Sequence, residues 1–198
     1  MGLLKVAELK ADDVVFVSAA AGAVGNLAVQ IAKLRGHTVI GSAGSAEKVR
    51  FLREQLGCEH AFSYRDGDIA ELLRAAAPDG IDVYFDNVGG DHLEAALGVL
   101  RPHGRVALCG AISDYNRAEA IGPRNLFNAV AKGLTLRGFL ARMYADQMDA
   151  FRRDMRRWLA DGRIVYPETV FEGLEQAPRA LMAQLTGENV GKVLVRVS

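Results

Sequence analysis

The sequence predicts an α/β protein built on a doubly wound, six-stranded parallel sheet. Three observations carry this prediction. Six short apolar runs of strand character alternate with helical segments along the chain. Most of these runs lack alternating polar residues, which is typical of strands that are covered on both faces. The first run ends in a glycine-containing turn that opens a helix, and the strand count matches a Rossmann dinucleotide-binding fold.

All six strand candidates are rich in Val, Ile, Leu and Phe. In chain order they are VVFVSA (14–19), TVIGSA (38–43), AFSY (61–64), IDVYFDNV (81–88), RVALCGAI (105–112) and LTLRGFL (134–140). Because each is followed by a helical period and not by a tight hairpin turn, we expect parallel strands joined by crossover helices.

Five helices are expected between these strands. In the first, Val24, Leu27, Ala28, Ile31 and Leu34 recur at helical spacing, and Gly36 predicts its end. Ser45 predicts the N-cap of the second, which stops at Gly57. The third ends at the PDG turn (78–80), the fourth runs from Asp91 to the RPHG turn (101–104), and the fifth runs from near Pro123 to Gly133.

After Leu140 the pattern changes. A long amphipathic helix carries Met148, Phe151, Met155, Trp158 and Leu159, and RIVYPETVFEG (163–173), a further helix (174–185) and a final strand KVLVRV (192–197) follow. This surplus does not fit a six-strand sheet. We therefore expect residues 1–140 to form a Rossmann domain and residues 141–198 to form a tail outside its sheet.

Composition excludes several functional classes. The 198 residues carry 24 Lys plus Arg and 24 Asp plus Glu, so the chain has no basic footprint for nucleic acid or an anionic membrane. No segment reads as a signal peptide or transmembrane helix. Cys58 and Cys109 lie in different elements and show neither disulfide-framework nor zinc-ligand spacing, so we expect a cytoplasmic protein without a metal site.

The turn after the first strand candidate reads Ala20-Ala21-Gly22-Ala23-Val24-Gly25. Compared with G-x-G-x-x-G, Ala20 replaces the first glycine. Gly22 would let the backbone approach a pyrophosphate, Gly25 would let the helix pack on the strand, and the helix N-terminus would attract phosphate. Its place between a strand and a helix favours a dinucleotide site over a tight turn without a ligand.

The cofactor subtype follows from the end of the second strand. An NAD site usually has an acidic residue about 20 residues downstream of the glycine turn. Here GSAGSAEK (41–48) offers only small residues at the strand end, and Glu47 already lies in the next helix beside Lys48. Space and a cation suit a 2′-phosphate, so we predict NADP(H), the alternative for Lys48 being a solvated surface lysine.

Five motifs, in this order, carry a resemblance to a known family: AAAGAVG (19–25), GSAGSAEK (41–48), YFDNVGG (84–90), CGAISDYN (109–116) and GENVGK (187–192). Together they resemble the zinc-independent medium-chain dehydrogenase/reductases. The most similar branch is the NADP-dependent alkenal/one reductases, with prostaglandin (leukotriene) and curcumin-reductase-like enzymes. The resemblance covers essentially the whole chain and implies NADPH-dependent reduction of the C=C bond of α,β-unsaturated ketones and aldehydes.

The resemblance implies a cofactor contact for 19 residues. In the order of the cofactor they are Gly22, Ala23, Val24 and Gly25 at the pyrophosphate; Gly44, Ser45, Lys48 and Tyr64 at the 2′-phosphate end; Asn87; Cys109, Gly110, Ala111, Ile112, Ser113 and Tyr115 along the nicotinamide; Phe139, Leu140 and Ala141 beside it; and Asn189 from the tail. Asn87 and Asn189 could also be plain turn residues, and Tyr64 a half-buried strand tyrosine.

By the same resemblance, Tyr115 is the candidate catalytic residue. Hydride transfer to the β-carbon builds negative charge on the substrate carbonyl oxygen, and a phenol O–H aimed at that oxygen would lower the barrier. The alternative is that Tyr115 only lines the cofactor or caps a loop.

The family places a GroES-like catalytic domain before the dinucleotide domain, and this chain starts where that domain would already have ended. The resemblance also implies that the tail, residues 141–198, packs on the Rossmann unit and on that catalytic domain. We therefore expect a C-terminal portion that binds NADP(H) but has little or no activity by itself, and a homodimer paired through the LTLRGFL edge strand. The rival interpretations are an NADPH quinone reductase of the same superfamily, a non-catalytic NADP-binding module and, least favoured, a methyltransferase-like domain.

Overall fold

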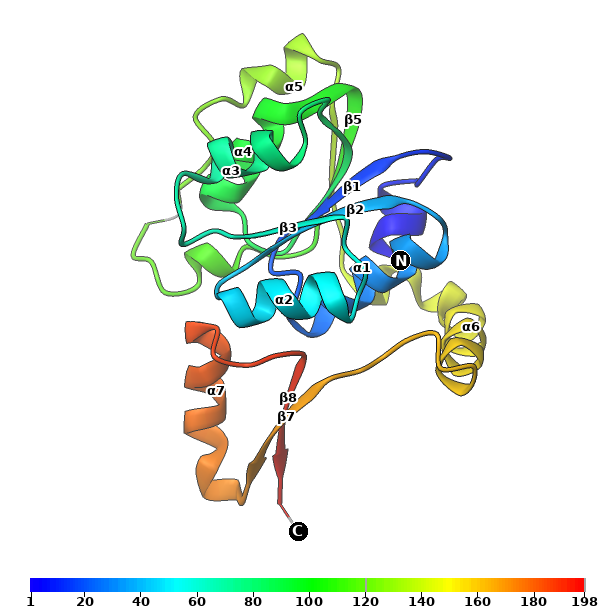
Figure 1. Ribbon diagram of the computed structural model, residues 1–198, viewed down its shortest axis with the longest axis vertical. Helices are drawn as coiled ribbons and strands as arrows, with labels where there is room; N and C mark the ends of the chain where they lie inside the picture. The colour runs from blue at the N-terminus through cyan, green and yellow to red at the C-terminus, as the bar shows by residue number, and fades with distance from the viewer. Residues whose placement is uncertain (120, 198) are drawn as a thin grey trace.

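A doubly wound sheet forms the body of the molecule. The computed structural model describes residues 1–119 and 121–197, so Ser198 of the expected tail lies outside the described residues. Its strands are β1 (Val14–Val17), β2 (Thr38–Ala43), β3 (His60–Ser63), β4 (Ile81–Asp86), β5 (Leu100–Leu108) and β6 (Thr135–Gly138). They pair in parallel in the order β3-β2-β1-β4-β5-β6, which confirms the predicted architecture (Figure 1).

Alternating residues of the strands are buried in two separate hydrophobic cores, one on each face of the sheet. In β1, Val15 and Val17 pack into one core, whereas Phe16, fully buried between them, packs into the other. Phe16 stacks on Tyr84 of the adjacent strand with ring centroids 4.9 Å apart. Burying one such side chain stabilises the fold by about 1.5–3 kcal/mol, so both faces of β1 contribute.

Helices cover the two faces of the sheet. The helices α1 (Ala23–Leu34) and α2 (Ala46–Glu54) lie on one side, and α3 (Ile69–Ala76) and α4 (Gly90–Val99) lie on the other (Figure 1). The N-terminal helical turn, Gly2–Val6, buries Leu3 and Val6 in the same core as α1. As predicted, Ser45 caps α2, with its Oγ accepting from the Lys48 backbone N–H at 3.3 Å.

Two predictions about the later elements were wrong. The RPHG segment is not a turn before the fifth strand but the first half of β5, where the register against β4 shifts between Ile81 and Val83. His103 adopts a positive φ of 63° there, so a local irregularity inside a strand reads as a turn in the sequence. The fifth helix, α5, is only Phe127–Ala131, since residues 124–126 form a turn after Pro123.

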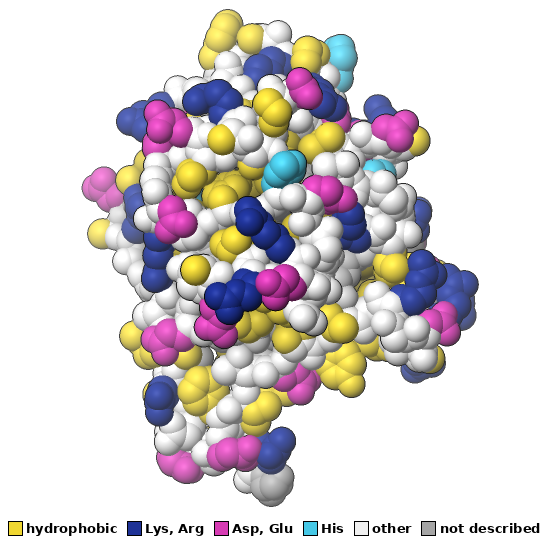
Figure 2. Space-filling model, in the orientation of Figure 1, with side chains coloured by type: hydrophobic (Ala, Val, Ile, Leu, Met, Phe, Trp, Pro, Cys, Tyr) yellow, Lys and Arg dark blue, Asp and Glu magenta, His cyan; other side chains and the backbone are white. Residues whose placement is uncertain are grey.

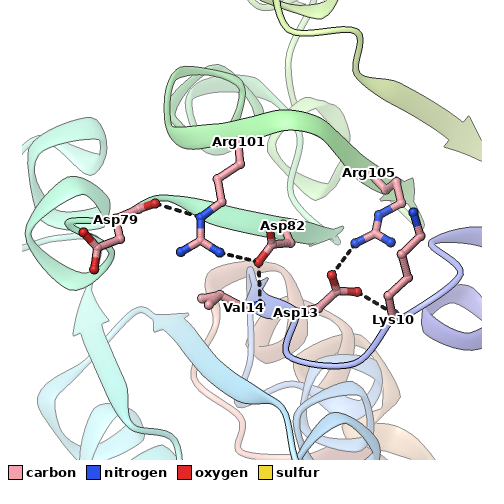
Figure 3. Close-up of polar contacts among 7 residues, drawn as sticks. All are labelled: Lys10, Asp13, Val14, Asp79, Asp82, Arg101 and Arg105. Atoms are coloured by element: carbon pink, nitrogen blue, oxygen red, sulfur yellow. Dashed lines mark hydrogen bonds and ion pairs between the residues drawn. The ribbon is translucent and has the colours of Figure 1, made fainter.

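Ion pairs hold the amino-terminal edge of the sheet, opposite the edge at which ligands bind in such folds (Figure 3). Asp13, just before β1, pairs with Arg105 of β5 at 2.6 Å, and both side chains are largely buried. Asp82 of β4 accepts from Arg101 at 2.7 Å and from the Val14 N–H at 2.9 Å. These contacts fix the strand starts and leave the carboxyl edge free.

The tail forms a second unit beside the sheet. It consists of a helical segment (Ala141–Gln147), α6 (Met148–Ala160), β7 (Glu168–Glu172), a short turn (Leu174–Gln176), α7 (Ala177–Thr186) and β8 (Lys192–Arg196). The strands β7 and β8 pair in parallel as a separate two-stranded sheet. Figure 1 shows this ribbon and α7 extending away from the body below α2, with α6 on the other side.

Candidate functional site

The glycine turn is shaped by steric necessity. A Cβ on Gly25 would lie 2.2 Å from the carbonyl oxygen of Ala19, so only glycine allows α1 to start so close to β1. Gly22 is the N-cap of α1 and has no side chain to occupy the free backbone N–H groups. A helix N-terminus left open in this way is suited to a phosphate. The predicted contact of this turn with a pyrophosphate stays a prediction, and the backbone geometry is compatible with it.

A cleft of about 540 Å³ runs along the carboxyl edge of the sheet from this turn. We call it the carboxyl-edge cleft. Of the 19 predicted contact residues, those that line it are Gly22, Ala23, Val24, Gly25, Gly44, Lys48, Tyr64, Asn87, Cys109, Gly110, Ile112, Ser113, Tyr115 and Asn189. Ser45 is used as the helix cap instead, and Ala111 packs against Gly89. The structure thus brings most of the predicted set into one continuous cleft.

Lys48 lies at one end of this cleft. Its Nζ donates to the carbonyl oxygen of Gly187 at 2.7 Å, which links α2 to the end of α7 in the tail. Burial lowers the pKa of Lys48, and the charge of Arg65 lowers it further, whereas Glu47 raises it. A partly desolvated ammonium group beside a second cation is suited to an anionic ligand.

Tyr64 stands beside Lys48 in a fixed position. Its hydroxyl would lie 2.8 Å from a Cβ on Gly44, so the glycine at the end of GSAG makes room for it. The ring meets His92 edge to face, with centroids 5.3 Å apart. Burial lowers the pKa of His92 to about 4, so the imidazole stays neutral beneath the tyrosine at neutral pH.

Asn87 and Asp86 organise the middle of the cleft. The Asn87 side-chain nitrogen donates to the Ser18 carbonyl at 2.7 Å, and the Asn87 backbone N–H donates to Ser18 Oγ at 3.0 Å. Asp86 is buried and accepts from the N–H groups of Val88 and Gly89, and burial raises its pKa. These contacts tie β1 to the loop after β4 and hold the cleft floor rigid.

The loop from Cys109 to Tyr115 forms the far side of the cleft. It is fixed by the Ser113 Oγ, which donates to the Val88 carbonyl at 2.7 Å. The Tyr115 hydroxyl lies over Gly110, 3.5 Å from the position of a Cβ there, while 64% of the Tyr115 side chain is exposed. Burial and the Asp86 charge raise the pKa of Cys109, which argues against a thiolate nucleophile.

A second, apolar pocket of about 590 Å³ adjoins the cleft. The remaining predicted residues, Phe139, Leu140 and Ala141, line this pocket and not the cleft. The two spaces share Ala23, Val24, Cys109 and Lys192, so they meet between the glycine turn and Cys109, a residue that the sequence predicts at the nicotinamide. The junction places an apolar space next to the expected reacting end of the cofactor.

The tail itself forms part of the cleft wall. Gly191 pairs with Gly22 in an isolated parallel bridge, and its N–H donates to the Ala21 carbonyl at 2.8 Å. Asn189 is buried, with its side-chain nitrogen donating to the Gly191 carbonyl at 2.9 Å. In the structure Asn189 therefore shapes the turn that meets the glycine loop, and direct contact with a cofactor stays a prediction.

Sequence reasoning missed four residues, of which His92 and Lys192 line the cleft and Arg65 and Gln30 lie behind residues of the site. Arg65 and His92 flank Tyr64, Lys192 lies at the junction of the two pockets, and Gln30 bonds both backbone groups of Val165 at 2.8 and 2.9 Å. The sequence held a signal only for Arg65, which directly follows Tyr64 at a strand end. The others come from contacts between distant segments.

The fold and the cleft define a dinucleotide-binding α/β protein. The sequence profile described as zinc-binding dehydrogenase matches residues 23–160, and the chain belongs to this family. In the described ranges, 1–119 and 121–197, no three His, Cys, Asp or Glu side chains gather to hold a metal ion. The same ranges contain no helix long and apolar enough to cross a membrane.

Relatives with known names agree with the predicted branch. The chain is 43% identical over 198 residues to the NADP⁺-dependent 2-alkenal reductase of Nicotiana tabacum, covering all of this chain and 58% of that protein. It is 43% identical to prostaglandin reductase 1 of Bos taurus, covering 98% and 60%. The solved structure of CurA from Vibrio vulnificus in complex with NADPH is 39% identical, with a TM-score of 0.94, covering 100% and 60%.

The coverage percentages show that this chain is shorter than its relatives. The chain spans about three fifths of each of these relatives, so any part of an activity that depends on their remaining residues is not contained in it. The predicted family, an NADP-dependent reductase branch of the medium-chain dehydrogenase/reductases, is confirmed.

Proposed function

We propose that this chain is the NADPH-binding part of a reductase that saturates the C=C bond of α,β-unsaturated ketones and aldehydes. The observation that carries the proposal is the carboxyl-edge cleft, which joins an open helix N-terminus, Lys48 and an adjoining apolar pocket in one line. The names of the relatives support both the cofactor and the substrate class. The end of the cleft with Lys48 would hold the 2′-phosphate of the dinucleotide, and the end that adjoins the apolar pocket would hold the nicotinamide.

The residues of the chain would divide the work of binding. Gly22 and the first N–H groups of α1 would hold the pyrophosphate, and Lys48 would pair with the 2′-phosphate. Neither Ser42, Ala43 nor Gly44 presents a carboxylate that would repel it. This arrangement selects NADPH over NADH.

When bound, NADPH supplies a hydride for the substrate β-carbon. Tyr115 would donate its phenol O–H to the substrate carbonyl oxygen, where negative charge develops as the enolate forms. One such donor contributes about 3 kcal/mol of barrier lowering. Phe139 and Leu140 would exclude water from the apolar side of the reacting centre.

Positioning of the substrate would require residues in addition to those of this chain. Holding two reactants in place supplies roughly 7–11 kcal/mol of barrier lowering. We propose that residues 1–140 form the Rossmann domain, and that residues 141–198 complete a preceding catalytic domain in the full-length protein. We further propose a homodimer in the cytoplasm, where the two free thiols, Cys58 and Cys109, remain reduced.

The test is an assay of NADPH oxidation with a simple enone, on this chain and on a chain extended by the upstream domain. We expect NADPH binding in both and turnover only in the second, reduced by Tyr115→Phe about 100-fold. Turnover with quinones but not enones would favour the quinone reductase alternative. Binding without turnover in the extended chain would favour a non-catalytic module.

A further inference from the structure

A second cation, Arg65, lies over the ring of Tyr64, which lines the carboxyl-edge cleft together with Lys48. Lys48 belongs to α2, which follows β2, and Arg65 follows β3. The two strands stop at the same level, because Ala43 at the end of β2 pairs with Ser63 at the end of β3. The segments that follow these ends, residues 44–48 and 64–65, therefore flank one location at the carboxyl edge. Parallel strands make this placement a consequence of the fold.

Arg65 is held there by Tyr64. Its guanidinium carbon lies 5.9 Å from the Tyr64 ring centroid, within the range of a cation–π contact. The ring is itself fixed between Gly44 and His92 and lines the cleft. Among the described residues, no carboxylate lies within 4.0 Å of the Arg65 guanidinium, although seven other arginines pair with one.

The electrostatics of this end call for an anion. Burial lowers the pKa of Lys48, the charge of the exposed Arg65 lowers it further, and Glu47, on the same helix as Lys48, raises it. Two neighbouring cations repel each other, and a doubly charged anion that contacts both removes that repulsion. A phosphate monoester carries this charge and accepts the planar guanidinium donors in pairs.

We propose that Arg65 is a specificity-determining residue that contacts the 2′-phosphate of NADPH together with Lys48. The inference rests on the proposed cofactor and adds a residue that the glycine and lysine motifs do not include. Tyr64 acts as the platform that presents the guanidinium, and Lys48 approaches from α2. The selectivity for NADPH then depends on two cations, one from α2 and one from the segment after β3.

The experiment is calorimetric titration of the chain with NADPH, NADH and 2′,5′-ADP. For Arg65→Gln we expect NADPH and 2′,5′-ADP to bind at least about tenfold more weakly, since a charge-assisted contact is lost. NADH affinity should not change. Arg156→Gln, which removes an exposed arginine of α6, is the matched control and should change neither.

Two further arms separate a contact from a general effect of charge. Arg65→Lys keeps the charge but not the planar fork, and should bind NADPH with intermediate affinity. In 0.5 M NaCl, where the Debye length falls to about 4–5 Å, the difference between Arg65→Gln and the unmutated chain should persist. A difference that disappears in salt, or NADPH binding by Arg65→Gln equal to that of the unmutated chain, would overturn the proposal.

The proposed function fails in a different way. If Lys48→Gln lowers NADPH affinity while Arg65→Gln does not, the cofactor assignment stands and the role of Arg65 is refuted. If the unmutated chain binds NADPH and NADH equally, the cofactor assignment itself is refuted. The double variant should lose less than the sum of the two single losses, because both side chains contact one phosphate.

Discussion

His92 shows how a single buried residue couples the cleft to stability. It lies on α4 beneath Tyr64, 4% exposed, and its Nε2 has no hydrogen-bond partner among the described residues. Burial lowers its pKa from 6.5 to about 4, while Asp91 raises it slightly. Between pH 6.5 and 4, His92 is therefore mostly protonated in the unfolded chain and mostly neutral in the folded protein.

The sign of the resulting pH dependence follows directly. Because the folded pKa of His92 is below the unfolded value, its contribution to stability is complete above pH 6.5 and is lost as the pH falls toward 4. We expect the free energy of unfolding to fall by up to about 1.4 kcal/mol per pH unit in this range through His92 alone.

Urea unfolding of the unmutated chain and of His92→Leu at a series of pH values measures this slope. The variant should have a shallower slope between pH 6.5 and 4, whereas His60→Leu, which replaces an exposed histidine, should not. Equal slopes for all three proteins would show that His92 is not buried and neutral as described.

At the scale of elements, the tail is joined to the cleft by side chains of α1. The Asn26 side chain donates to the Gly22 carbonyl at 2.7 Å, and Gln30 donates to Asn26 at 3.2 Å and pairs with both backbone groups of Val165. Gln30 thus acts like a strand partner for the segment before β7. A continuous series of hydrogen bonds therefore links the glycine turn to the tail.

Gln30→Leu should loosen this connection. It removes both hydrogen bonds that join α1 to Val165, a residue that is 43% exposed, and each such bond contributes about 0.5–1.5 kcal/mol. We expect faster hydrogen exchange at the Val165 amide and weaker NADPH binding, because the tail residues Gly191 and Asn189 line the cleft. Gln55→Leu, at an exposed glutamine after α2, serves as the control. Unchanged exchange at Val165 would contradict this role.

The elements show what the sequence could and could not predict. The apolar runs predicted all six strands of the main sheet and their parallel arrangement, because strands covered on both faces are rich in apolar residues without polar alternation. The RPHG segment was misread, since Pro, His and Gly also occur in a strand irregularity. Lys48 and the glycine turn were predictable from local spacing. His92 and Gln30 were not, because their roles depend on Tyr64 and Val165, which are distant in the sequence.

At the scale of the whole molecule, the 24 basic side chains balance the 24 acidic ones, whereas exposed apolar side chains gather near one edge of the sheet. Figure 2 shows acidic and basic side chains interspersed over the visible face, without a patch of one sign. By contrast, Leu126, Phe127 and Val130 in and before α5 are 52%, 74% and 73% exposed. They lie close in the sequence to β6, the edge strand of the sheet, and an open edge of this kind favours pairing with a second strand.

We therefore expect a homodimer through β6 and α5. Sedimentation should show a dimer at tens of micromolar, and Val130→Asp should shift it to monomer by placing a charge in the apolar contact. Leu181→Asp, at an exposed apolar residue of α7, should leave the dimer intact. A monomer at this concentration, or equal dissociation by both variants, would contradict the predicted interface.

The central claim is that the carboxyl-edge cleft binds NADPH and selects it over NADH by contacts to the 2′-phosphate. It is tested most directly by calorimetric titration of the unmutated chain and of Lys48→Gln with NADPH and NADH. We predict that the unmutated chain binds NADPH at least about tenfold more tightly than NADH, and that Lys48→Gln removes most of this difference without weakening NADH binding. Equal affinity of the unmutated chain for the two cofactors would contradict the claim.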